Sequence, residues 1–410
     1  MNVGKETAQI RQLLKKENNQ VLLLILWKWL SWEGYGYETT TNIEGQMEGY
    51  FMKILVLGGS RFLGKTFVEA AQKQNHEITI FNRGNQNDGL RDVEILTGDR
   101  FGDLHALQGR YWDAVVDTSG FVPFTVAKST ELLKDRVNHY TFISSISVYK
   151  DWIPEKIDEN YPVLEMSEHE AYELSKDKNG PVYEYYGHFK ALCEKIAEKN
   201  MSGRVLNVRA GQLIGVHDYI DRIPYWVHRI ANGGKVLAPG NPNRPVQMID
   251  TLDLSNWILK MIMKNGFGTY NLTGPDFTLT MKQFLDTCIQ VTGSNAELVW
   301  MDEKFLLDQK VEPWTEMPLW LPEESPLSPE LEKPWKGGFT INNKKAIDSG
   351  LTFRPLRDSL AEIYEWEKQR TLSEEDWKSG MREKKEKDLL SLYLNEFHNF
   401  KHLPPRRFKA

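Results

Sequence analysis

Two residues spaced for proton transfer lie in the segment 186–190, YGHFK. On a helix, residues four apart share a face, so the Tyr186 hydroxyl and the Lys190 ammonium would serve one site. A free tyrosine has a pKa of about 10 and is mostly protonated at neutral pH, but a nearby cation favours the phenolate. The pairing would therefore turn Tyr186 into an acid–base group. Neither Tyr183 nor Tyr185 has a lysine four residues on, so the spacing selects Tyr186.

A second stretch, residues 52–66 (MKILVLGGSRFLGKT), could hold phosphates. The apolar run 54–57 reads as a buried parallel strand, glycines follow it, and the amphipathic run 63–74 predicts a helix. Small residues let the backbone approach a pyrophosphate, and the new helix points free N–H groups at it. Residues 59–66 match the triphosphate loop G-x-x-x-x-G-K-[ST], whereas residues 58–64, GGSRFLG, are similar to the turn of dinucleotide-binding proteins. A glycine turn without a ligand is the third interpretation.

Alternating strands and helices would position both stretches. After the strand at 54–57, further strands are predicted at apolar or β-branched runs: 77–82, 93–96, 113–117, 140–143 and 204–209. Alternation with helices at this spacing predicts an α/β fold with a doubly wound parallel sheet, a Rossmann fold. Ligands of such sheets gather at the carboxyl ends of the strands, where the serine-rich segment 144–149 lies. A plain serine-rich turn is the alternative for that segment.

The ends of the second and third predicted strands bear on the choice of dinucleotide. In NAD-binding folds, an acidic residue ends the second strand and bonds the ribose hydroxyls. Here the strand ends in Asn82 and Arg83. With no carboxylate to repel a 2′-phosphate, and with Arg83 and Arg61 nearby, we expect NADP to be preferred over NAD. After the third strand, Asp99 could accept a hydrogen bond from an adenine amino group or from its own turn.

Together these motifs resemble those of the short-chain dehydrogenase/reductase superfamily, in its extended and atypical branch of NAD(P)-dependent epimerase/dehydratase-like proteins. The resemblance covers roughly residues 52–365, with the motifs in the family's order. The segments that carry it are GGSRFLG (58–64), GDR (98–100), SSISVY (144–149), YGHFK (186–190), RPVQMIDTLDLSNWI (244–258) and YNLTG (270–274). A triphosphate loop would account for none of the later segments, so the dinucleotide interpretation is favoured.

The resemblance implies a role for each matching residue. Tyr186 would be the general acid or base, Lys190 would bind the nicotinamide ribose and lower the tyrosine pKa, and Ser145 would orient the substrate oxygen. The residues implied to wrap the pyrophosphate are Gly58, Gly59, Ser60, Arg61, Phe62, Leu63 and Gly64. The other implied cofactor contacts are Asn82 and Arg83 at the adenosine ribose, Asp99 and Arg100 at the adenine, and Thr118, Ser119 and Gly120 after the fourth strand.

Three departures from the family pattern matter. Arg61 stands at the middle glycine of the loop, so the backbone approach to a pyrophosphate must differ. Sugar 4,6-dehydratases carry an Asp-Glu pair where this chain has Ile146 and Ser147, so water elimination of that type is not expected. The charged segment 151–180 is long and would form either a lid over the site or a loose insertion.

These observations predict an NAD(P)-dependent oxidoreductase or epimerase that acts on a hydroxyl or carbonyl carbon of a small polar, sugar- or nucleotide-sugar-like substrate. An oxidoreductase would release changed cofactor, whereas an epimerase would return the hydride to the opposite face of the same substrate. Both need the same three residues, so both alternatives stay open. A non-catalytic dinucleotide-sensing or RNA-associated protein on the same fold is the second class of function.

Composition limits the partners. The 410 residues carry a net charge of −6, which gives no electrostatic footprint for nucleic acid. The two cysteines, Cys193 and Cys288, lack metal-ligand spacing, so no metal is expected and a reduced cytoplasm is the simplest setting. No membrane association is expected either, because the apolar run 21–27 is too short to span a bilayer. A homodimer is a possible assembly.

We expect four regions along the chain. Residues 1–51 would be an extension, with Met52 as an alternative start and a weak membrane-surface anchor as the other interpretation. Residues 52–209 would form the dinucleotide-binding domain, and 210–370 a substrate lobe from which some segments return to the first domain. A charged helical tail would follow at 371–410, with a solvated face or a partner surface as its role. Candidates to hold a polar or phosphorylated substrate in the lobe are His217, Asp221, Arg222, Arg244 and Gln247.

Overall fold

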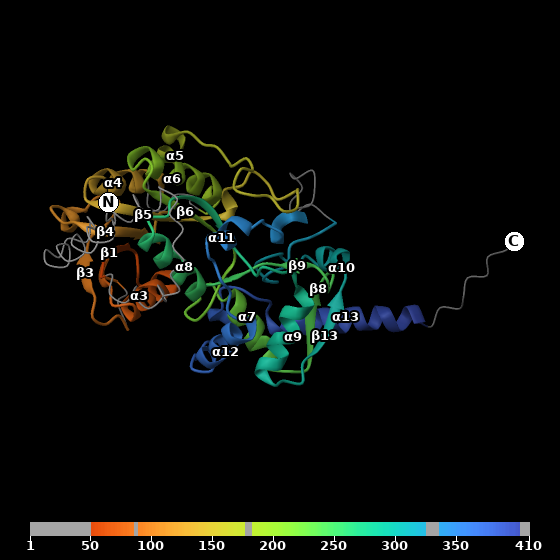
Figure 1. Ribbon diagram of the computed structural model, residues 1–410. Helices are drawn as coiled ribbons and strands as arrows, with labels where there is room; N and C mark the ends of the chain where they lie inside the picture. Colours follow the sequence, from red (N-terminus) through yellow and green to blue (C-terminus); the bar gives the residue numbers. More distant parts are fainter. Residues whose placement is uncertain (1–50, 86–88, 177–182, 325–335, 402–410) are drawn as a thin grey trace, which may run out of the picture. The chain divides into compact units, whose positions relative to one another are not determined.

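The computed structural model describes residues 51–85, 89–176, 183–324 and 336–401 (Figure 1). The extension expected over residues 1–51 lies outside these ranges except for Phe51. The end of the expected lid segment, 177–180, and the end of the expected tail, 402–410, also lie outside them.

A seven-stranded parallel sheet forms the centre of the fold and confirms the predicted doubly wound architecture (Figure 1). The strand order is β11-β6-β5-β4-β1-β2-β3, and each neighbouring pair is parallel. The strands are β1 (Lys53–Leu57), β2 (Glu77–Asn82), β3 (Glu94–Thr97), β4 (Trp112–Asp117), β5 (Val137–Ser145), β6 (Val205–Ala210) and β11 (Gly268–Leu272).

Burial on both faces explains why the central strands are apolar throughout. Successive side chains of a strand point to opposite faces, so a strand that is covered twice needs an apolar residue at every position. In β1, Leu55 and Leu57 pack in one core, and Ile54 and Val56 pack in the other. The helices of the first core are α4 (Pro123–Leu133) and α6 (Tyr186–Asn200), and those of the second are α3 (Phe62–Lys73) and α8 (Thr251–Met263). Shorter elements on this domain are η2 (His105–Leu107), η3 (Ile146–Val148), α5 (Glu168–Ser175) and α11 (Lys344–Asp348).

The residues after β6 build a second, smaller lobe around its own apolar core. Its helices are α7 (Arg222–Ala231), α9 (Met281–Thr292), α10 (Glu303–Asp308), η4 (Lys336–Phe339), α12 (Leu356–Glu367) and η5 (Glu374–Asp376). Its parallel strand pairs are β8 (Lys235–Pro239) with β13 (Glu297–Met301) and β7 (Leu213–Ile214) with β10 (Ile249–Asp250). An antiparallel pair joins β9 (Pro245–Val246) and β12 (Leu279–Thr280). Three elements that follow β6 in the sequence belong to the sheet domain instead. Strand β11 pairs with β6, and α8 and α11 pack in the second core of the sheet.

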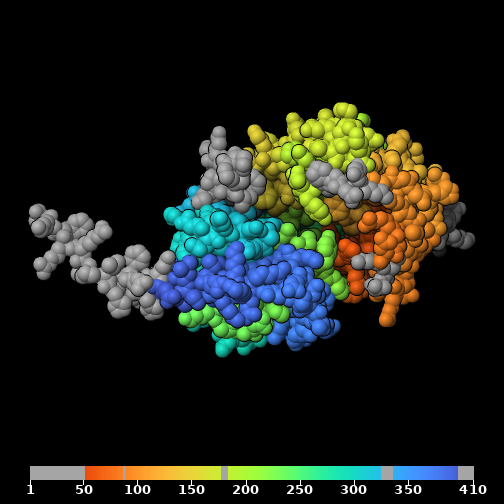
Figure 2. Space-filling model, turned by 180° about the vertical axis from the view of Figure 1, so that it is seen from behind, coloured from red at the N-terminus to blue at the C-terminus, as the bar shows by residue number. Residues whose placement is uncertain are grey.

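The C-terminal helix α13 (Glu383–Lys401) packs against the second lobe rather than presenting only a solvated face. Glu386 is 1% exposed, and its carboxylate accepts hydrogen bonds from Arg229 Nε and from the backbone N–H of Leu237. In the space-filling view, the blue C-terminal residues lie directly against the green and cyan residues of this lobe (Figure 2). The tail is therefore part of the lobe's structure.

The described residues contain no helix that is long and apolar enough to cross a membrane. In the same ranges, no group of three or more His, Cys, Asp and Glu side chains could hold a metal ion. Cys193 and Cys288 are buried free thiols on α6 and α9.

Candidate active site

The glycine loop between β1 and α3 leaves no room for side chains at three positions. Gly58 and Gly59 have φ values of 108° and 80°, which L side chains rarely adopt. A Cβ on Gly58 would lie 2.4 Å from Thr118 Oγ1, and one on Gly64 would lie 2.9 Å from the Gly59 backbone. The loop therefore folds tightly onto itself in front of the N-terminus of α3, where backbone N–H groups can meet an anion.

Arg61 fits this loop because its own backbone is extended. It is the N-cap of α3 at φ −135° and ψ 148°, a region open to any L-residue. Its side chain is exposed, with the guanidinium 5.5 Å from the ring centroid of Tyr219 in the second lobe. Phe62 and Leu63 are buried, and Ser60 is half-buried at the rim. The loop thus accommodates an arginine at the family's middle glycine by directing it outward.

The turn after β4 supports the glycine loop. Thr118 Oγ1 and Ser119 Oγ both donate to the backbone oxygen of Leu57, each at 3.0 Å, and Thr118 Oγ1 also accepts from the Gly59 N–H at 3.4 Å. The backbone oxygen of Gly120 accepts from Lys190 Nζ at 2.9 Å. In this structure these residues hold the loop and the lysine in place.

The residues predicted to contact the adenosine lie at the carboxyl ends of β2 and β3. Asn82 Oδ1 accepts from the Gly84 N–H at 2.8 Å, and the Arg83 side chain is exposed beside it. Asp99 Oδ1 accepts from the Phe101 N–H at 3.0 Å, the turn arrangement that was the alternative for this residue.

The Arg100 guanidinium has hydrogen-bond partners within the protein. It donates to both carboxylate oxygens of Asp117, at 2.6 and 2.8 Å, and to Ser129 Oγ at 2.6 Å. Tyr140 Oη donates to the same carboxylate at 2.7 Å. Breaking a buried ion pair is costly, so the Arg100 guanidinium is held by the protein itself, and its contact with an adenine stays a prediction. Arg100 ties the β3 turn to β4.

Ser145 and Tyr186 come together at the carboxyl end of β5. Ser145 is the last residue of β5, and its Oγ accepts from the Ser147 N–H at 3.1 Å as the cap of η3. Tyr186 is the first residue of α6, and its half-buried side chain lies close enough to Ser145 for the serine hydroxyl to influence the tyrosine pKa. Burial raises the pKa of the Tyr186 hydroxyl, while the Ser145 hydrogen bond and the charge of Arg222 act to lower it.

Gly187 makes this contact possible, although the sequence analysis did not single it out. A Cβ at this position would lie 2.2 Å from the Ser147 backbone oxygen. The absence of a side chain therefore lets the start of α6 lie directly against η3, which brings Tyr186 to Ser145. A glycine at the second position of a predicted helix is the sequence signal that could have pointed to it.

Lys190 lies on the same face of α6 but is directed into the protein. Its Nζ donates to the backbone oxygens of Gly120 and Ile143, at 2.9 and 2.7 Å. The ammonium lies 4.7 Å from the Phe121 ring centroid and 5.8 Å from that of Tyr186. Burial lowers the pKa of Lys190 to about 8. Since an ammonium has three donors, one remains for another acceptor such as a ribose hydroxyl.

The second lobe adds Asp218 and Arg222, which lie before and at the start of α7. Asp218 is 1% exposed, and its Oδ1 accepts from the Ile220 N–H at 2.9 Å, whereas its Oδ2 has no hydrogen-bond partner. Burial raises the pKa of this carboxyl to about 6. Arg222 has a buried Nε without a partner, and its Cζ lies 4.8 Å from the Trp314 ring centroid. No motif or spacing identifies Asp218 in the sequence.

Arg244 is a second buried arginine near the same rings. It is 4% exposed, and its Cζ lies 5.9 Å from the ring centroid of Phe339, which stacks on Trp314 at 5.9 Å. Its Nη1 is 3.1 Å from the Glu323 carboxylate, an ion pair by distance but without the alignment of a hydrogen bond. Burial lowers the pKa of Arg244 to about 10. We call Arg222, Trp314, Phe339 and Arg244 the arginine–aromatic row.

The other three predicted substrate contacts have partners elsewhere. Asp221 Oδ1 accepts from Arg370 Nη2 at 2.7 Å. The Gln247 side-chain amide bonds the backbone oxygen and N–H of Ile341, at 2.9 and 2.8 Å. His217 packs its ring on Trp366 at 5.8 Å. Of the five candidates, Arg222 and Arg244 retain donors without hydrogen-bond partners.

No family model matches the chain, and no curated protein matches its sequence. Among solved structures, the enzyme WbmG of Bordetella bronchiseptica in complex with NAD superposes with a TM-score of 0.56 at 15% identity, covering 78% of this chain and 95% of its own. The UDP-N-acetylglucosamine 4-epimerase of Bacillus cereus gives 0.52 at 17% identity, over 76% and 98%. The dTDP-glucose 4,6-dehydratase of Bacillus anthracis with NAD gives 0.54 at 18%, over 80% and 99%. This chain shares their fold.

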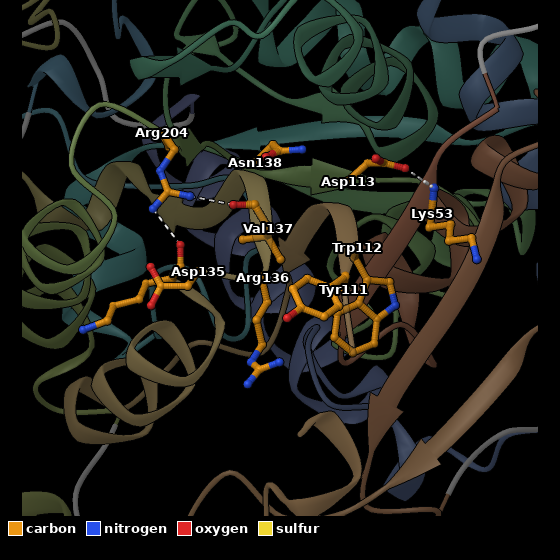
Figure 3. Close-up of a pocket in the computed structure, with 10 residues that line it drawn as sticks. Lys53, Tyr111, Trp112, Asp113, Asp135, Arg136, Val137, Asn138 and Arg204 are labelled. Carbon is orange, nitrogen blue, oxygen red and sulfur yellow. Dashed lines mark hydrogen bonds between the residues drawn. The ribbon is translucent and has the colours of Figure 1, made fainter. Parts of the chain in front are cut away.

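A separate cavity of about 620 Å³ lies at the opposite edge of the sheet, where the strands begin (Figure 3). Lys53, Tyr111, Arg136 and Arg204 are among its lining residues. The Arg204 guanidinium donates to the backbone oxygens of Val137 and Lys134, so its charge is engaged there (Figure 3). None of the residues predicted for catalysis or cofactor binding lines this cavity. In open parallel sheets of this fold, ligands bind at the carboxyl ends of the strands, so the candidate active site is the one built around Tyr186.

Proposed function

We propose that this protein is an NAD(P)-dependent oxidoreductase or epimerase that acts at a carbinol or carbonyl carbon of a small polar substrate. The observation that carries the proposal is the half-buried Tyr186 side chain at the start of α6, whose hydroxyl interacts with Ser145 at the carboxyl end of β5. Lys190 lies one turn along the same helix and is bonded to the turn after β4. Two of the solved structures that share this fold are an enzyme in complex with NAD and a 4-epimerase. Their similarity supports the same class of chemistry for this protein.

The glycine loop fits a dinucleotide pyrophosphate, because Gly58, Gly59 and Gly64 let the backbone fold closely against Thr118, Ile80 and itself in front of the N-terminus of α3. A bound nicotinamide would supply the hydride acceptor or donor. Ser145 would hold the substrate oxygen, and the Tyr186 phenolate would take the hydroxyl proton as the carbon loses its hydride and a carbonyl forms. In the reverse direction Tyr186 would return the proton to the oxygen. Lys190 would offer its remaining donor to the nicotinamide ribose.

We propose NADP as the preferred dinucleotide. Asn82 and Arg83 end β2 without a carboxylate, and the exposed guanidinium of Arg83 could pair with a 2′-phosphate. Glu94, the first residue of β3, is hydrogen-bonded to Thr79 at 3.1 Å and so lies at the amino end of that strand, away from Asn82 at the carboxyl end of β2.

The arginine–aromatic row favours a substrate with an anionic group, such as a phosphorylated or nucleotide-linked sugar. Arg222 and Arg244 both bring buried donors that lack hydrogen-bond partners, and such donors gain most from a charged acceptor. Trp314 and Phe339 stack on one another, and each also contacts one of the two guanidiniums, so the rings support the arginines. Water elimination is not included, because Ile146 and Ser147 follow Ser145 and supply no carboxyl acid or base.

Cofactor binding is the first test of the proposal. Titration of the full-length protein with NADPH and with NADH can be followed by energy transfer from its 13 tryptophans. We expect NADPH to bind about tenfold or more tightly than NADH. A preference for NADH would overturn the NADP assignment, and binding of neither would favour a non-catalytic scaffold on this fold.

Turnover is the second test, on a panel of sugar nucleotides and sugar phosphates. Replacing Tyr186 by Phe should lower the rate by about 10² to 10⁴ and leave the dissociation constant of NADPH within about twofold. An unchanged rate would rule out Tyr186 as the acid–base group. In D₂O, an epimerase would invert the carbinol carbon without taking up deuterium there, whereas an oxidoreductase would change the absorbance of the dinucleotide at 340 nm.

A further inference from the structure

The second lobe contacts the glycine loop through the segment 215–221, which lies between β7 and α7. The Tyr219 ring lies against the Arg61 guanidinium, with 5.5 Å between the ring centroid and Arg61 Cζ. Earlier in the segment, a Cβ on Gly215 would lie 3.8 Å from the Phe62 ring. Two consecutive residues of the glycine loop thus face one short segment of the other lobe, so the two lobes meet at the start of α3.

Hydrogen bonds on both sides of Tyr219 fix its position. Asp218 Oδ1 accepts from the Ile220 N–H at 2.9 Å, which closes a turn around Tyr219. Asp221 Oδ1 accepts from Arg370 Nη2 at 2.7 Å, and its Oδ2 accepts from a backbone N–H of the C-terminal segment at 3.1 Å. Both aspartate side chains are buried, whereas Tyr219 is 49% exposed. A turn anchored inside the second lobe therefore presents this ring at the surface.

Arg61 stands where an anion would meet the glycine loop. It is the N-cap of α3, and the first N–H groups of a helix lack partners within the helix and attract anions. A guanidinium that stacks on a ring directs its N–H donors outward in its own plane, where they can pair with phosphate oxygens. In the usual dinucleotide loop the middle glycine lets the backbone approach the pyrophosphate, whereas this chain places a cation at that position.

We propose that Tyr219 is a positioning residue for cofactor binding: its ring holds the Arg61 guanidinium beside the N-terminus of α3, where the guanidinium binds the pyrophosphate of the dinucleotide. The proposal rests on the proposed function, because it needs a dinucleotide in the glycine loop. It adds a residue of the second lobe to a binding site whose sequence motifs all lie in the sheet domain. Dinucleotide binding and the contact between the lobes should therefore strengthen one another.

The ring contributes to binding by restricting the arginine before the cofactor arrives. An exposed arginine samples many rotamers, and the loss of this freedom opposes binding. A cation–π contact at an exposed site changes an equilibrium by about two- to fivefold, whereas a charge-assisted hydrogen bond to phosphate contributes about tenfold or more. The contact uses the face of the Tyr219 ring rather than its hydroxyl, so a phenylalanine should serve equally well at this position.

The test is a fluorescence titration of the full-length protein and its variants with NADPH and with NADH. We expect Arg61→Gln to raise both dissociation constants about tenfold, and Tyr219→Leu to raise both about two- to fivefold. Because Tyr219 acts through Arg61, the double variant should bind no more weakly than Arg61→Gln alone. Tyr219→Phe should bind as the unaltered protein does. The pyrophosphate is common to both dinucleotides, so a loss confined to NADPH would place Arg61 at the 2′-phosphate and overturn the proposal.

Tyr111→Leu is the matched control, because Tyr111 is also exposed and its ring centroid lies 5.4 Å from Arg136 Cζ, at the opposite edge of the sheet. It should leave both dissociation constants unchanged, and far-UV circular dichroism checks the folding of each variant. Unchanged binding in Tyr219→Leu, additive losses in the double variant or an equal loss in Tyr111→Leu would overturn this proposal and leave the proposed function standing. Binding of neither dinucleotide by the unaltered protein would overturn both.

Discussion

At the scale of single residues, Gly187 determines whether Tyr186 can reach Ser145. Its hypothetical Cβ meets the Ser147 backbone oxygen at 2.2 Å, and a backbone atom cannot swing away as a side chain can. We expect Gly187→Ala to destabilise the protein by about 1–3 kcal/mol and to reduce turnover by more than tenfold. Urea unfolding and the rate on the best substrate measure both effects. Gly102→Ala is the control, because nothing lies within 4 Å of a Cβ there, and an equal loss in both variants would contradict the steric argument.

Asp218 should make stability depend on pH in a defined direction. Burial raises its pKa from 3.8 to about 6, so between these values the unfolded chain releases a proton that the folded protein retains. Stability therefore falls as pH rises through this window, by roughly 2–3 kcal/mol in total. Asp218→Asn keeps an oxygen for the Ile220 N–H and removes the charge. We expect it to gain most of that amount at pH 8 and little at pH 4, as measured by urea unfolding. An equal gain at both pH values would show that the charge is not the cause.

At the scale of elements, the strands could be predicted because helices cover both faces of the sheet. The predicted run 77–82 coincides with β2. The run 54–57 lacks only the first residue of β1, and the run 113–117 lacks only the first residue of β4. The first residues of β5, from Val137, were not predicted, because Asn138 and His139 interrupt the apolar run. Local sequence carries this information, since each position responds to burial of its own side chain.

The candidate site was predictable where its residues are close in sequence and not where they come from different elements. The spacing of Tyr186 and Lys190 follows from the helix, and the glycine loop follows from its own backbone. By contrast, Arg100 meets Asp117 across two strands, and Asp221 meets Arg370 of the C-terminal segment. Such pairings depend on tertiary packing, which leaves no periodic signal in the chain. Lys190 shows the difference within one residue, since its position was predictable but its hydrogen-bond partners were not.

The turn before α7 links the candidate site to the C-terminal segment. Arg370 donates to Asp221 and to Glu367, and its guanidinium stacks on Trp366 and Trp377 at 4.5 and 5.3 Å. Arg370→Ala would leave the largely buried carboxylates of Asp221 and Glu367 without this partner. We expect a loss of about 2–4 kcal/mol in the free energy of unfolding, measured with urea. Arg370→Lys should recover only part of this loss, because an ammonium lacks the planar fork. Equal stability of Arg370→Ala and the unchanged protein would show that Arg370 does not hold this turn.

At the scale of the whole molecule, α13 completes the second lobe rather than extending from it. The buried Glu386 carboxylate joins α13 to α7 through Arg229 and to β8 through the Leu237 N–H, while Leu389, Leu390 and Tyr393 enter the lobe's apolar core. Glu386→Ala would leave Arg229 Nε and the Leu237 N–H without an acceptor and would remove the carboxylate that pairs with the guanidinium. We therefore expect a loss of about 3–5 kcal/mol, with the second lobe becoming sensitive to proteolysis first.

Lys384→Ala provides the matched control on the same helix, because its ion pair with Asp388 is exposed and should contribute less than about 0.5 kcal/mol. The two variants together show whether α13 stabilises the lobe. If both lower the free energy of unfolding by a similar small amount, α13 contributes little to the lobe. If Glu386→Ala also weakens turnover more than NADPH binding, the defect lies on the substrate side, as expected when α7 and its Arg222 lose support while the glycine loop of the sheet domain stays intact.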